Sequence, residues 1–181
     1  LSQFLAGRYK VARVTAAGSI VHYSDVGQRR EEAYSKIILG QCHLHLGDHQ
    51  AARDNAQEGL EMAESVGFPR GTGMGLGLLG AVALAESNYA EARTQCEASL
   101  ARDSGVPATS ARLALATRLS GNAPQPEVEA AALAAFRDAF GADGVHRSHD
   151  PARHNAELGL LTAVLGSKML DAPDLSALQE R

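Results

Sequence analysis

The sequence LGQCHLHLGDHQAARDNAQEGLEMA, residues 39–63, recurs in outline as LGAVALAESNYAEARTQCEASLARD, residues 79–103. The two segments match at six positions, each pair 40 residues apart: Leu39 with Leu79, Gly40 with Gly80, Leu44 with Leu84, Ala52 with Ala92, Arg53 with Arg93 and Leu60 with Leu100. A further register lies 40 positions upstream, where Gly7, Tyr9, Ala12 and Ile20 fall on Gly47, His49, Ala52 and Leu60. Self-similarity at a fixed spacing is typical of proteins built from stacked supersecondary units.

Each unit is predicted to contain two helices. The apolar residues Ile38, Leu39, Cys42 and Leu46 recur at spacings of three and four, as in a helix that is packed on one side. Gly47-Asp48 then ends this helix, and Asp48 is a suitable N-cap for the next one.

Small residues mark the second helix of the unit. Ala52, Ala56 and Gly59 lie at helical spacing, so we expect the paired helices to approach each other closely. The segment SVGFPRG, residues 65–71, is predicted to be the turn between units. The segment PATSARLALATRLSGN, residues 107–122, is predicted to be the first helix of a further unit.

The chain is therefore divided into repeats within a single domain, residues 1–181. We expect a partial repeat at 1–27, repeats at 28–67, 68–106 and 107–141, and a degenerate or capping unit at 150–181. The chain starts without methionine and, by its pattern, inside a helix, so we expect it to be a piece of a longer protein.

Composition favours an all-α fold, and the repeated helix pairs predict an alpha-alpha superhelix of stacked antiparallel helix pairs. Hydrophobic residues make up 45% of the 181 residues but aromatic residues only 4%, and strands prefer β-branched and aromatic side chains. A net charge of −4 disfavours nucleic acid as a partner. The longest apolar run, within residues 74–85, is too short to span a bilayer, and two cysteines indicate a reducing, cytoplasmic compartment.

The chain resembles the tetratricopeptide repeat (TPR) family. The residues that carry the resemblance are Leu39-Gly40, Gly47-Asp48-His49, Ala52 and Leu60, with Leu79-Gly80, Asn88-Tyr89, Ala92 and Leu100 in the next unit. The family's usual period is about 34, and the longer period here is similar to that of helical arms in large bacterial transcriptional and signalling regulators. The departures are Lys36, where a large apolar residue is usual, and His43 and Ala83, which replace an aromatic residue.

The segment CHLHLGDH, residues 42–49, raises the question of a metal site, because Cys42, His45 and His49 share one helical face. Within the repeat frame, however, His49 holds the position of Tyr9 and Tyr89, and none of the usual zinc-ligand spacings is present. We therefore expect no metal ligands there, although His45 is left without a structural role. A looser group, His146, His149 and His154, is interpreted as a polar connector.

Catalytic motifs are not evident. GLGLLG, residues 75–80, satisfies the dinucleotide-binding pattern, but it follows a turn instead of a strand and contains the repeat's own glycine. These glycines predict that this helix is either the softest of the array or the most closely packed. We expect neither catalytic residues nor a cofactor, and hence no enzyme.

The resemblance implies a concave groove lined by the first helix of each unit. The corresponding groove residues are Tyr34, Ile37, Gln41, Leu44, Met74, Gly77, Ala81 and Leu84. Because this set is mostly apolar, we expect it to bind a protein or peptide segment, including one from the same polypeptide, and an open groove also allows two copies to pair. Glutamate or lysine at Ile37 or Leu44 is expected to weaken binding without unfolding the array.

A second hypothesis is an effector-sensing arm. An apolar groove also suits a small molecule, whose binding would control an attached ATPase, DNA-binding or cyclase domain. The two hypotheses differ in whether small effectors raise the melting temperature of the protein.

Overall fold

The computed structural model describes residues 8–103 and 107–121, which form six helices and no strand. The helices are α2 (Tyr9–Asp25), α3 (Arg29–His45), α4 (His49–Ser65), α5 (Pro69–Ala85), α6 (Tyr89–Arg102) and α7 (Pro107–Leu119). Those from α2 to α6 begin at residues 9, 29, 49, 69 and 89, so one helix and its turn take 20 residues and a helix pair takes 40. The predicted all-α fold class is confirmed.

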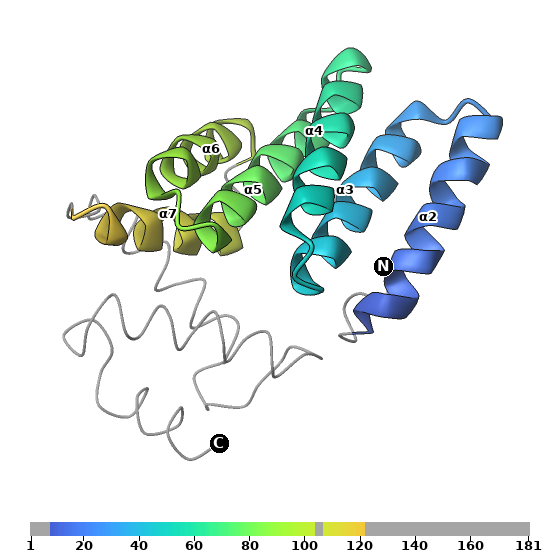
Figure 1. Ribbon diagram of the computed structural model, residues 1–181. Coiled ribbons are helices and arrows are strands. Elements are labelled where there is room, and N and C mark those ends of the chain that lie inside the picture. The colour runs from blue at the N-terminus through green and yellow to red at the C-terminus, as the bar shows by residue number, and fades with distance from the viewer. Residues whose placement is uncertain (1–7, 104–106, 122–181) are drawn as a thin grey trace, which may run out of the picture.

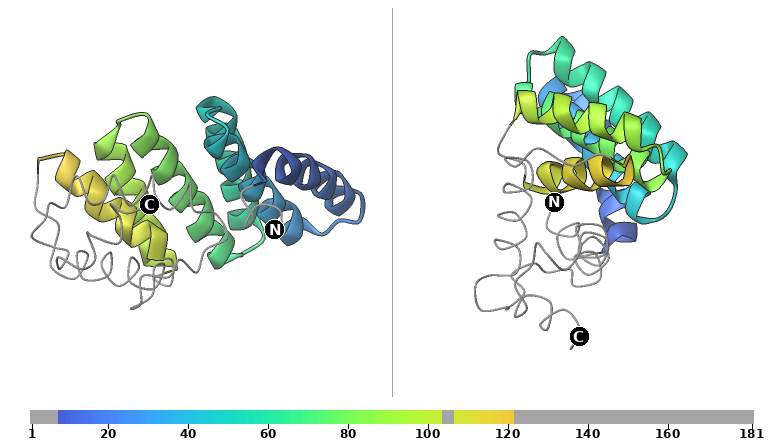
Figure 2. Two further views of the ribbon diagram at one scale, coloured as in Figure 1. Left: turned by 90° about the horizontal axis from the view of Figure 1, so that it is seen from below. Right: turned by 90° about the vertical axis from the view of Figure 1, so that its left-hand side faces the viewer.

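The helices lie side by side in chain order, from α2 at one end to α7 at the other (Figure 1). Each helix packs against the next, and in addition α3 contacts α5, and α5 contacts α7 (Figure 2). We call α3, α5 and α7 the first helices and α2, α4 and α6 the second helices of the pairs. The α3–α4 pair lies within residues 28–67 and the α5–α6 pair within residues 68–106.

Four turns of three residues join α2 to α3, α3 to α4, α4 to α5 and α5 to α6. Each has a left-handed residue in the middle: Gly27, Gly47, Gly67 and Ser87, with φ of 70°, 82°, 59° and 62°. After α3, the Gly47 N–H donates to the Leu44 carbonyl (3.1 Å) and the Asp48 N–H donates to the His43 carbonyl (2.9 Å). This is a Schellman motif, which satisfies carbonyls that the helix end leaves unpaired.

The helix starts were partly predictable. The Asp48 carboxylate accepts a hydrogen bond from the Ala51 N–H (3.1 Å), which confirms Asp48 as an N-cap. One unit later, the Asn88 side chain accepts a hydrogen bond from the Glu91 N–H (3.4 Å) and caps α6 in the same way. The turn expected at residues 65–71 is shorter in the structure, because α4 ends at Ser65 and α5 begins at Pro69. Proline is tolerated in the first turn, where its missing N–H has no helical partner.

Replacing the left-handed turn residues is expected to lower the stability of the protein at Gly47 and to raise it at Ser87. Gly47→Ala is expected to destabilise the fold by about 1 kcal/mol, because a Cβ is disfavoured at positive φ, and no neighbouring atom within 4 Å contributes to the effect. Ser87→Gly relieves the same strain and is expected to stabilise by up to about 1 kcal/mol. Urea unfolding of both variants measures the difference, and equal losses in both would contradict it.

The core consists mainly of small and aliphatic side chains where three helices meet. Ile37 of α3, Leu60 of α4 and Val82 of α5 belong to one buried cluster, together with Ala52, Ala56, Leu78 and Leu79. Small residues bring α3 and α4 close together, since a Cβ built on Gly59 would lie 2.7 Å from the Ile37 Cγ1. The expected close approach at Ala52, Ala56 and Gly59 is therefore present.

Charged side chains tie neighbouring helices at the surface. Arg53 of α4 donates to Glu91 of α6 (Nη1 to Oε1, 2.6 Å) and also to Glu86 at the end of α5. Lys36 of α3 donates to Glu58 of α4 (2.6 Å). Lys36 thus joins the two helices of its own pair, whereas Arg53 joins one pair to the next.

Candidate functional site

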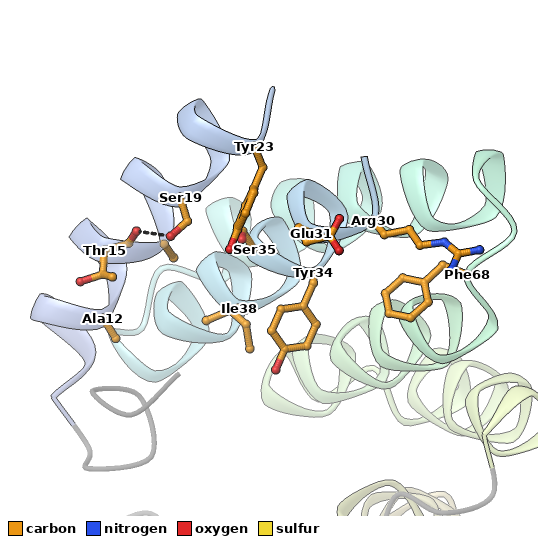
Figure 3. Close-up of a pocket in the computed structure, with 11 residues that line it drawn as sticks. Ala12, Thr15, Ser19, Tyr23, Arg30, Glu31, Tyr34, Ser35, Ile38 and Phe68 are labelled. Carbon is orange, nitrogen blue, oxygen red and sulfur yellow. Dashed lines mark hydrogen bonds between the residues drawn. The ribbon is translucent and has the colours of Figure 1, made fainter. Parts of the chain in front are cut away.

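A groove with a cavity volume of about 560 Å³ runs between α2 and α3 at one end of the described array (Figure 3). We call it the end groove. It is lined on α2 by Ala12, Thr15, Ala16, Ser19 and Tyr23, on α3 by Arg30, Glu31, Tyr34, Ser35 and Ile38, and also by Phe68. Ala12 and Ala16 of α2 pack against Ile38 and Cys42 of α3 and are buried. Their side chains are small, so they leave the space beside them open.

The lining of the end groove combines apolar side chains with hydroxyl-bearing and charged ones. Two of its hydroxyl groups are already paired, since the Thr15 Oγ1 donates to the Val11 carbonyl (3.1 Å) and the Ser19 Oγ donates to the Thr15 carbonyl (3.0 Å). Figure 3 shows Tyr23 extending from the end of α2 into the space between α2 and α3. The exposed charges Arg30 and Glu31 lie at one side of this lining.

The eight residues predicted to line a concave groove differ in exposure. The half-buried ones are Tyr34, Gln41, Leu44, Met74 and Leu84, and the buried ones are Ile37, Gly77 and Ala81. Of these eight residues, only Tyr34 also lines the end groove. Leu44 and Met74 pack against the cluster around Ile37, and Leu84 packs against Ala83, Ala92 and Ala116.

Ile37 is part of the core. Its side chain is 0% exposed and fits over Gly59 of α4, where a Cβ would come within 2.7 Å of its Cγ1. The expectation that a charge at Ile37 leaves the array folded is corrected accordingly, because a charged side chain there would be buried away from water. Gly77 is also packed against other helices, since a Cβ built on it would lie 3.1 Å from the Ser99 and Thr109 hydroxyls.

The histidines and cysteine of residues 42–49 have structural contacts. His45, for which the sequence offered no role, stacks on Tyr9 with ring centroids 4.5 Å apart. The His43 Nδ1 lies 3.4 Å from an Asp48 carboxylate oxygen, although the geometry does not make a hydrogen bond. Across residues 8–103 and 107–121, no three His, Cys, Asp or Glu side chains are grouped so that they could hold a metal ion.

Both cysteines are buried and free. Burial raises the pKa of the Cys96 thiol to about 11, and it also raises the pKa of the Cys42 thiol. A protonated, buried thiol is a poor nucleophile and packs as a small apolar group. The described cysteines therefore show no sign of catalytic activation.

The glycine pattern at residues 75–80 lies inside helix α5, and its glycines contact neighbouring helices. A Cβ on Gly75 would lie 2.9 Å from the Leu60 Cβ, and a Cβ on Gly80 would lie 2.7 Å from the Cys96 Sγ. Of the two outcomes left open for this helix, close packing is the one the structure shows. Residues 122–181 lie outside the described part, and with them His146, His149 and His154 and the last predicted repeats.

Sequence reasoning missed the end groove. The repeat pattern identified α2 only through Tyr9, Ala12 and Ile20, and nothing in it marked Thr15, Ser19 or Tyr23 as lining a cavity. One signal was available. These residues lie 40 and 80 positions before residues of α4 and α6, so their role could have been compared with the role of those residues. In addition, no helix in the described part is both long and apolar enough to cross a membrane.

Comparison with known proteins identifies no relative. No protein-family model matches the chain, and no curated protein or solved structure matches it significantly.

Proposed function

We propose that this chain is a non-catalytic, TPR-like protein-interaction module that binds a protein segment along its first helices. The observation that supports it is the direct contact of α3 with α5 and of α5 with α7. Because α3 and α5 begin 40 residues apart, equivalent side chains fall on the same face of these two helices. Tyr34 and Met74 form one such pair, and Leu44 and Leu84 form another.

These four side chains are half-buried, so each keeps part of its apolar surface accessible. An accessible apolar stripe across neighbouring helices suits the apolar face of a partner helix or an extended segment. Gln41 lies between the two pairs along α3 and is also half-buried. Binding would then depend on burial of apolar area more than on charge.

The test uses the full chain and its variants for affinity capture and compares the proteins that each of them retains. Leu44→Glu with Leu84→Glu places a charge at each end of the stripe, and Gln41→Arg adds one where no apolar packing is lost. Both variants are expected to lose bound proteins that the unmodified chain retains, as measured by quantitative mass spectrometry after affinity capture.

The matched control is Gln57→Glu, at an exposed position of α4. It is expected to retain the same proteins, with circular dichroism confirming the fold of every variant. Identical capture by the control and by the folded stripe variants would refute the proposal.

A further inference from the structure

The place that the end groove occupies beside α2 and α3 recurs twice further along the array, beside α4 and α5 and beside α6 and α7. A helix fills both of these places. The end groove lies between a second helix, α2, and the following first helix, α3. The equivalent position between α4 and α5 is taken by α3, which contacts both, and the one between α6 and α7 is taken by α5, which also contacts both. The occupants inside the array are therefore first helices.

Every α2 residue that lines the end groove has an equivalent that touches such an occupant. On α4, Ala52 and Asn55 lie 3.0 and 3.2 Å from a Cβ built on Gly40 of α3, and Gly59 lies against Ile37. Three residues of α6 lie close to a Cβ built on glycines of α5: Ala92 and Cys96 at Gly80, and Ser99 at Gly77. Asp103, which follows α6 directly, lies close to a Cβ built on Gly73. These residues are equivalent to Ala12, Thr15, Ala16, Ser19 and Tyr23 of α2.

One residue of the α3 wall also has an equivalent that touches a first helix. Ile38 lines the end groove, and its equivalent Leu78 lies 2.9 Å from a Cβ built on Gly40 of α3. The α2 wall of the groove, and Ile38 on the α3 wall, thus consist of positions whose equivalents within residues 8–103 and 107–121 contact a first helix.

We propose that the end groove is an acceptor site for an α-helix with the contact pattern of α5. The pattern is a small residue at three positions of one helix face, as at Gly73, Gly77 and Gly80. Serine at position 19 selects this pattern. On α6, Ser99 lies opposite Gly77 (3.1 Å from a built Cβ), whereas on α4 the equivalent Gly59 leaves room for Ile37.

The α2 wall of the end groove suits a helix better than a small effector. The groove's volume of about 560 Å³ lies in the range of small-molecule sites, but such sites carry converging polar groups that fix the ligand. Here the hydroxyls of Thr15 and Ser19 already donate to carbonyls of their own helix. The remaining α2 lining is two alanines and a tyrosine, a surface suited to close helix packing.

The test uses the full chain and a fluorescein-labelled peptide with the sequence of residues 69–85, extended by three lysines for solubility. Fluorescence anisotropy is expected to show saturable binding. A control peptide with Gly73→Leu, Gly77→Leu and Gly80→Leu is expected to bind at least about tenfold more weakly, because the leucines would clash with the α2 wall.

Protein variants then locate the site. Thr15 is exposed and lines the groove, so Thr15→Arg is expected to weaken peptide binding at least about tenfold without unfolding the chain. Ala17→Arg, an exposed position of the same helix outside the groove lining, is the matched control and is expected to leave binding unchanged.

Three results would overturn the proposal: no binding of the peptide, equal binding of the leucine peptide, or equal binding to the Thr15→Arg variant. A chain that self-associates through Thr15 but takes up no peptide would also overturn it and would assign a second copy as the occupant. The end groove shares only Tyr34 with the stripe on the first helices. Leu44→Glu and Leu84→Glu are expected to leave peptide binding intact, so the two proposals fail separately.

Discussion

Ile37→Glu is expected to abolish cooperative folding of the described helices at room temperature. Ile37 is 0% exposed and lies among Ala52, Ala56, Leu60 and Leu78, with Gly59 directly opposite. Loss of a buried isoleucine costs about 2–5 kcal/mol, and a carboxyl group buried without a partner adds about 1–3 kcal/mol. The sum approaches the total stability of about 5–15 kcal/mol that domains have.

The measurement is thermal and urea unfolding followed by circular dichroism. Ile37→Val removes one methylene group and is expected to cost only about 0.5–1.5 kcal/mol. Leu44→Glu makes a similar change from apolar to acidic two turns further along α3, at a half-buried position, and its loss of stability is expected to be clearly smaller. An Ile37→Glu variant that melts like the unmodified chain would show that this side chain is not in the core.

Gly80→Ala is expected to destabilise the protein by about 1–3 kcal/mol, the usual cost of overpacking a filled core. In an exposed helix interior the same change stabilises, by about 0.5–1 kcal/mol. At Gly80 the new Cβ would lie 2.7 Å from the Cys96 Sγ and 3.3 Å from the Ala92 carbonyl oxygen of α6. The steric cost of separating α5 from α6 therefore outweighs the helix propensity of alanine.

The chain provides a matched control for this prediction. Gly18 lies in the middle of α2, is exposed, and has no atom within 4 Å of a built Cβ, so Gly18→Ala is expected to stabilise by about 0.5–1 kcal/mol. The clash at Gly80 can also be relieved from the other side. In a Cys96→Ala background, Gly80→Ala should cost much less, and a double-mutant cycle measures this coupling. Stabilisation by both glycine replacements, or zero coupling with Cys96, would contradict the close packing of α5 on α6.

The alternating turns and helices were determined by local sequence. The glycines at 47 and 67 predict helix ends because they adopt positive φ without a steric penalty, and Asp48 and Asn88 predict helix starts because their side chains accept from the first-turn N–H groups. Each of these interactions spans only a few residues. The repeat spacing, the all-α class and the helix α7 at residues 107–119 followed from such local signals.

Tertiary structure decided which face of each helix is buried. The spacing of apolar residues identifies a stripe on α3, but a first helix packs on its own partner and on the next first helix at once, and this double contact draws Ile37 into the core. The same holds for the glycines of α5, which read locally as helix-weakening residues. Their effect depends on Leu60, Cys96 and Ser99, which approach from other helices.

The end groove also depends partly on local sequence and partly on tertiary structure. The sequence of α2 by itself determined that Ala12, Ala16 and Ser19 are small and lie on one helical face. It did not determine whether that face would be filled, because α4 and α6 present equivalent residues and are covered by α3 and α5. Coverage depends on contacts between segments far apart in the chain, and only the assembled array shows that the face of α2 forms an open groove.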